Sequence, residues 1–129
     1  MAIHKAPDPK NAEVHNNLGI VLDDQGDLPN AKVHLERAIA IDPKYALAQA
    51  NLGMVLAKLG DVKEAEEHLQ TSVQLDPEQY MAHTSLGELL AKQEKLTEAR
   101  SHFEQALKIA PDYAPARKSL AAMSAASAK

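Results

Sequence analysis

Apolar residues recur along this chain at steps of three and four, in stretches separated by Gly, Asp and Pro. One such stretch holds Leu52, Val55, Leu56 and Leu59. This spacing places apolar side chains on one face of a helix. After Gly60 the same spacing resumes, and it ends before Pro77, where proline prevents the helix from continuing. The pattern predicts two amphipathic helices joined by a turn.

The predicted helix pair recurs with a period of 34 residues. The period is marked by Pro9, Pro43, Pro77 and Pro111. The same offset relates the pairs Leu18-Gly19, Leu52-Gly53 and Leu86-Gly87, with Leu120-Ala121 as a weaker fourth copy. One hairpin of this size cannot bury its apolar stripe alone, so neighbouring hairpins must stack on each other. The chain is therefore predicted to be all-α, an α-solenoid of stacked helix-turn-helix repeats.

The order of residues within each period resembles the tetratricopeptide repeat (TPR) family. That repeat also has about 34 residues, with Leu-Gly, a large apolar residue, Ala and finally Pro in this order. The resemblance implies a right-handed superhelix, in which first helices line the concave face and second helices form the convex face. It places a lead-in or the remnant of a preceding repeat at 1–11, full repeats at 12–45, 46–79 and 80–113, and a capping helix at 114–129.

The chain departs from the family pattern at Ser72, where Ala is usual, and at two further kinds of position. The slot near the start of each first helix, where Trp or Tyr is usual, holds His15, Gln49 and His83. The turn of the third repeat has Glu94-Lys95 where the first two repeats have Gly-Asp. These departures leave the helical periodicity intact.

A glycine in the middle of each first helix needs an explanation. Gly19, Gly53 and Gly87 are at equivalent positions, and such a glycine costs a helix roughly 0.5–1 kcal/mol relative to Ala. We interpret it as the omission of a side chain that lets the two helices of each hairpin approach closely.

Composition and charge exclude several classes of partner. The net charge of −4 gives no attraction to the phosphates of nucleic acid or to anionic lipid. The chain has no cysteine, which excludes disulfides, Cys-ligated zinc and a thiol nucleophile. It has no run of about 18 apolar residues that would insert in a membrane. We therefore expect a soluble, cytoplasmic protein that binds neither nucleic acid nor membrane.

The histidines do not suggest a metal site, and no motif suggests catalysis. His34, His68 and His102 are in register on the second helices, but packed helices lie about 8–10 Å apart and parallel side chains do not converge on one zinc ion. His15 and His83 are on non-adjacent repeats. We interpret the second-helix histidines as amphipathic fillers beside the core. The chain has no phosphate loop, HExxH motif or nucleophile elbow, so we predict no enzyme activity and no cofactor.

The predicted function therefore depends on the concave face. Helical spacing from the Leu stripe predicts that Asn16, Ala50 and Thr84 point into the groove. The residues predicted to bind a partner are Asn17, Ile20, Asp24, Leu47, Asn51, Met54, Lys58, Met81, Ser85, Glu88 and Lys92. A protein or peptide segment is the predicted partner, and the chain is predicted to be a non-catalytic scaffold.

The asparagines before two of the Leu-Gly pairs have two interpretations. An amide carries both a donor and an acceptor, so Asn17 and Asn51 suit the backbone of an extended peptide. On these two residues the chain resembles the repeats of protein O-GlcNAc transferases, where an asparagine ladder grips the substrate polypeptide. Alternatively, the two amides bond neighbouring helices and hold the repeats together.

One function of the family is disfavoured by the groove residues, and two alternative functions remain. Repeats that clamp the C-terminal carboxylate of chaperones use Lys, Arg and Asn, whereas the corresponding slots here hold Asn16, Ile20, Asn51, Met81 and Ser85, of which only Asn51 matches. Self-association through an apolar surface at the N-terminal end is one alternative function. A targeting arm of a larger enzyme, such as a glycosyltransferase, is another.

Overall fold

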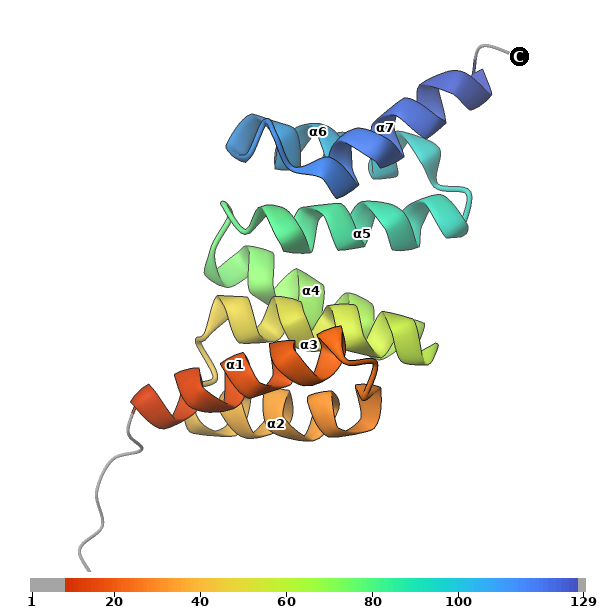
Figure 1. Ribbon diagram of the computed structural model, residues 1–129. Coiled ribbons are helices and arrows are strands. Elements are labelled where there is room, and N and C mark those ends of the chain that lie inside the picture. Colours follow the sequence, from red (N-terminus) through yellow and green to blue (C-terminus); the bar gives the residue numbers. More distant parts are fainter. Residues whose placement is uncertain (1–8, 128–129) are drawn as a thin grey trace, which may run out of the picture.

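The computed structural model describes residues 9–127, and this part of the chain forms seven helices without a strand (Figure 1). They are α1 (Pro9–Asp24), α2 (Leu28–Ile41), α3 (Ala46–Leu59), α4 (Val62–Leu75), α5 (Tyr80–Lys92), α6 (Leu96–Ile109) and α7 (Ala114–Ser127). Within this range no helix is both long and apolar enough to cross a bilayer. Most of the predicted lead-in lies outside the described residues, and its last three, 9–11, belong to α1.

The helices pair in chain order into three hairpins. α1 packs on α2, α3 on α4 and α5 on α6, and α7 packs on α6 (Figure 1). Successive first helices also contact each other, from α1 through α3 and α5 to α7, whereas no two second helices touch anywhere in 9–127. The first helices therefore form the tighter, inner layer of the stack. This arrangement confirms the predicted all-α solenoid of helical repeats.

The first helices α3 and α5 each bury an apolar stripe against the preceding hairpin. In α3 the stripe is Ala48, Leu52 and Val55, of which at most 2% of the surface is exposed. The equivalent residues of α5 are also buried, and both stripes join the second-helix residues Leu35 and Leu69 in one continuous core. Stacking thus provides the burial that a single hairpin lacks.

The glycine in each first helix lies where the two helices of a hairpin come closest. A Cβ atom on Gly53 would lie 2.5 Å from Cγ of Leu69, and one on Gly19 would lie 2.6 Å from Cγ of Leu35. The equivalent glycine of α5 meets the ring of Phe103 in the same way. The interpretation of the glycines as close-contact positions is confirmed.

The turns inside the hairpins share one backbone conformation. Gly26 and Gly60 end the first helices with φ of 81° and 89°, in the left-handed region that glycine adopts without strain. Glu94 occupies the same place after α5 with φ of 63°. A side chain there costs about 1–2 kcal/mol, so the third turn has the same geometry at a higher conformational cost.

Replacing Gly53 with Ala should destabilise the protein. The added methyl group overlaps the fully buried Leu69, and such overpacking costs about 1–3 kcal/mol, which exceeds the roughly 1 kcal/mol that Ala adds to helix propensity. Chemical denaturation followed by circular dichroism measures the difference in free energy of unfolding. If Gly53→Ala instead increased the free energy of unfolding, as it would in a helix with no neighbour at this position, the contact with Leu69 would not limit the size of the side chain.

Replacing Glu94 with Gly should stabilise the protein by about 1 kcal/mol, because Gly removes the strain of the positive φ. Glu94→Ala is the matched control, since it removes the same side chain but keeps a Cβ atom. The two variants are compared by the same denaturation experiment. Equal effects would mean that the side chain of Glu94, and not its backbone, determines the stability of this turn.

Candidate functional site

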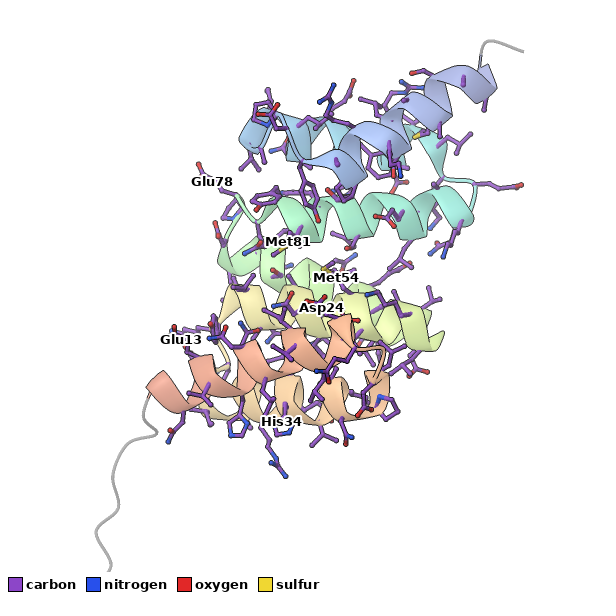
Figure 2. The ribbon with its side chains drawn as sticks, viewed as in Figure 1. Glu13, Asp24, His34, Met54, Glu78 and Met81 are labelled. Carbon is purple, nitrogen blue, oxygen red and sulfur yellow. The ribbon has the colours of Figure 1, made fainter. Side chains whose placement is uncertain are left out.

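The predicted partner-binding residues lie along the layer of first helices, and none of them is fully buried. Figure 2 shows Asp24, Met54 and Met81 on α1, α3 and α5, whereas His34 lies on the second helix α2. Two clefts in this layer gather part of the set. Some of the predicted residues therefore line a common cleft, and the others lie separately along the surface of this layer.

Three residues predicted to point into the groove are instead buried. Asn16, Ala50 and Thr84 are at most 2% exposed, because they lie where successive first helices contact each other. Asn16 donates through Nδ2 to the hydroxyl of Tyr45 at 3.3 Å, and its Oδ1 accepts from Nδ2 of Asn51 at 3.0 Å. Asn51 therefore holds α3 against α1. This agrees with the second interpretation of the asparagines, in which the amides bond neighbouring helices and hold the repeats together. Asn17 is exposed.

The first cleft, called here the α3–α5 cleft, has a volume of about 150 Å³. It is lined by Met54, Ala57, Lys58, Ser85, Glu88, Leu89 and Lys92. Five of the eleven predicted residues therefore meet in one place, and the other six line neither cleft. Nζ of Lys58 forms an ion pair of 2.8 Å with Oδ1 of Asp23, on the α1 side. This pair closes the corresponding space between α1 and α3.

The second cleft, called the α5–α7 cleft, repeats the first one hairpin later. All seven lining positions of the α3–α5 cleft recur 34 residues further along, from Glu88 to Ala126. Its volume is about 580 Å³. It is wider because Ala122 and Ala126 replace the longer Glu88 and Lys92, and because α7 turns away from α5 (Figure 1).

The α5–α7 cleft has an apolar floor with cations beside it. Leu96 of α6 is exposed at the gap, the buried Phe103 lies beneath it, and Met123 of α7 lines the same cleft. Lys92 and Arg100 also line the cleft. Sequence reasoning did not place Leu96 or Arg100 in a site. No sequence signal distinguishes Leu96, since Leu28 and Val62 are apolar at the equivalent positions and line neither cleft.

Glu88 lines both clefts, with lysines on either side. Desolvation raises the pKa of its carboxyl group, while Lys92 and Lys58 oppose this shift. The carboxylate is thus less well solvated than an ordinary surface glutamate. A cationic group of a partner would lower this cost, because it would add a favourable charge next to Glu88.

The histidines pair within each repeat rather than along the stack. Nδ1 of His15 lies 3.0 Å from Nδ1 of His34, with ring centroids 5.2 Å apart and planes 19° apart. The centroid distance exceeds the nitrogen distance by about the width of one ring, so the rings meet edge to edge in an N–H···N hydrogen bond. Two zinc ligands would each need to converge on the metal at about 2.0–2.1 Å, and head-on nitrogens leave no space for it.

The partner of each second-helix histidine is the residue that departs from the family pattern. His83 Nε2 donates to the carbonyl oxygen of Pro77 at 2.9 Å, so its neutral Nδ1 accepts from Nδ1 of His102 at 3.1 Å. In the second repeat Gln49 replaces the imidazole, donating to the carbonyl of Pro43 and accepting from His68. The interpretation of these histidines as fillers was incomplete, since they link the two helices of a repeat.

The described residues contain no group of three His, Cys, Asp or Glu side chains that could hold a metal ion. They also contain no buried side-chain nitrogen or oxygen without a hydrogen-bond partner. The buried polar side chains of this part of the protein therefore have hydrogen-bond partners within the fold.

A stack of helical hairpins whose first helices line a clefted inner layer defines the class of α-solenoid repeat proteins. The sequence agrees: residues 12–45 and residues 50–114 each match a tetratricopeptide repeat profile. The chain belongs to the tetratricopeptide repeat family. No curated protein matches it.

Solved structures show the same fold. The first TPR domain of human RPAP3 is 24% identical, with a TM-score of 0.84 over 94% of this chain and 95% of that one. The second, solved with the HSP70 peptide SGPTIEEVD, is 27% identical, with a TM-score of 0.78 over 91% and 98%. An O-GlcNAc transferase mutant of Thermobaculum terrenum is 22% identical, with a TM-score of 0.85 over 93% of this chain and 23% of that one.

The histidine pairs should make folding sensitive to acid. Desolvation lowers the pKa of His34, and Arg37 and His15 lower it further. Desolvation and His83 likewise lower the pKa of His102, against the effect of Glu98. Because both groups bind protons less readily in the folded state, their contribution to stability is present above the ordinary pKa of 6.5 and is lost as the pH falls below it.

Replacing His15 and His83 with Gln should reduce this loss, because the resulting Gln–His pairs resemble Gln49–His68 and accept a protonated imidazole. Melting temperatures at about pH 7.5 and about pH 5.5 should differ less for the double variant than for the unaltered protein. His68→Gln, which removes a histidine outside any His–His pair, should leave the difference unchanged. An equal effect of the double variant and of His68→Gln would contradict the role of the pairs.

Proposed function

We propose that this chain is a non-catalytic scaffold that binds an extended protein segment along its first helices. One large apolar side chain of that segment is anchored in the α5–α7 cleft. The observation that carries the proposal is the recurrence of one cleft in two successive repeats, the second of them open to about 580 Å³. This volume lies in the range of about 300–1,000 Å³ that is typical of ligand sites.

The walls of the α5–α7 cleft select the anchor. Leu96, Phe103 and Met123 offer apolar contact, and a flexible methionine adapts to different side chains. The two cations Lys92 and Arg100 outnumber Glu88, which also lines this cleft, so a carboxylate next to the anchor would form charge-assisted hydrogen bonds. The preferred segment therefore has a large aliphatic or aromatic residue followed by Asp or Glu.

The family relatives support this chemistry. The peptide SGPTIEEVD that accompanies the second TPR domain of human RPAP3 contains an isoleucine followed by two glutamates. In the present chain, Asn16 is buried and bonded to Tyr45 and Asn51, so it does not offer its amide to a terminal carboxylate. Recognition is expected to depend on the internal Ile-Glu-Glu sequence and not on the free C-terminus.

A fluorescently labelled SGPTIEEVD peptide and its C-terminally amidated form should bind with similar affinity, as measured by fluorescence anisotropy. Arg100→Glu should weaken binding about tenfold or more, because it places a negative charge beside the glutamates of the peptide. Lys108→Glu makes the same charge change on α6 outside the cleft and should leave the affinity within about twofold.

Leu96→Glu tests the apolar anchor in the same assay. It should weaken binding about tenfold or more, whereas Val62→Glu, at the equivalent position of α4 and outside both clefts, should have little effect. Both residues are exposed, so the fold should tolerate either change, which circular dichroism verifies. Loss of binding on amidation, or equal effects of the two variants, would contradict the proposed site.

A further inference from the structure

The outer face of α1 carries an exposed apolar stripe. Val14, Leu18 and Val21 are 59%, 39% and 49% exposed, and they follow each other at steps of four and three along one helical face. The same positions of α3 and α5 are at most 4% exposed: Ala48, Leu52, Val55, Ala82, Leu86 and Leu89. The stripe of α1 is thus the inter-repeat face of a first helix without a hairpin against it in the described residues.

The first residue of the stripe argues against another hairpin stacked in the usual way. The equivalent residues of the other first helices are Ala48, Ala82 and Ala116, and each is fully buried against the preceding hairpin. Val14 is larger by two methyl groups than these alanines, whose surfaces are fully buried in the stack. The stripe of α1 therefore differs in shape from the faces by which α3, α5 and α7 stack on the hairpins before them.

We propose that the stripe binds the same stripe of a second copy of this chain, with the two α1 helices antiparallel about a twofold axis. The order Val, Leu, Val is nearly symmetric about Leu18. An antiparallel pair therefore places Leu18 opposite Leu18 of the second copy, and Val14 opposite Val21. Such a self-complementary surface is what an isologous dimer requires, and antiparallel helices also oppose their dipoles favourably.

Polar residues border the stripe. Steps of about 100° per residue place the neutral amides Asn11, Asn17 and Gln25 beside it, and they place position 10, a lysine, on the same side of the stripe as Glu13 and Asp24. The rim of an antiparallel pair therefore holds charges of both signs, and the apolar stripe itself provides the association.

Sedimentation equilibrium over a concentration series measures the association. The weight-average mass should rise from 14.0 kDa towards twice this value. Leu18→Glu should weaken dimerisation about tenfold or more. Val33→Glu is the matched control: Val33 is an exposed apolar residue of α2, and the equivalent residue of α4 is already Glu67. It should have no effect.

A charge-pair experiment tests the antiparallel register. Val14→Glu alone and Val21→Lys alone should each dimerise less than the unaltered protein. An equimolar mixture of the two variants should recover dimers, because the new Glu of one copy lies opposite the new Lys of the other. Val14 and Val21 are the two most exposed residues of the stripe, so both variants should fold, and circular dichroism checks this.

Three results would overturn the proposal. A mass of 14.0 kDa at all concentrations would exclude the dimer. Equal weakening by Leu18→Glu and Val33→Glu would indicate unspecific association of exposed apolar residues. Failure of the mixed variants to recover dimers, when each alone is monomeric, would exclude the antiparallel pair and favour parallel or head-to-tail contact. None of these results depends on peptide binding, so the groove is tested separately.

Discussion

Every hairpin of this protein depends on one contact, between a glycine of the first helix and a large buried side chain of the second. Gly53 and Leu69 illustrate it, since a single added carbon would overlap the leucine. The close approach brings the two apolar stripes of a hairpin together, and it leaves a continuous face on which the next hairpin stacks. The helix propensity that glycine lacks is small compared with the packing it permits.

A second set of contacts holds the second and third hairpins to the turns before them. In many positions of a protein interior an aromatic ring would fill such a slot, but here His83 and Gln49 bond both a proline carbonyl and a second-helix histidine. These polar links are directional, so they orient the helices as well as joining them. They also make the interior responsive to protonation, which an apolar filler would not be.

The two ends of the stack present different surfaces. At the C-terminal end α7 turns away from α5 and opens a cleft over Phe103, and we assign the anchoring of a peptide to it. At the N-terminal end the stripe around Leu18 is exposed, and we assign self-association to it. The surfaces lie on opposite sides of the central hairpin, so a dimer through α1 would leave both clefts accessible and would present two peptide sites in one assembly.

The sequence by itself determined the repeat, the helices and the role of Gly53, because periodicity and turn residues are local properties that recur in each copy. It also identified the inner face to which Met54 and Lys58 belong. Only the tertiary structure decided that Asn16 is buried, that His15 meets His34, and that one cleft opens to Leu96. These features depend on where helices distant in sequence cross and diverge, and no periodic pattern within one helix specifies those angles.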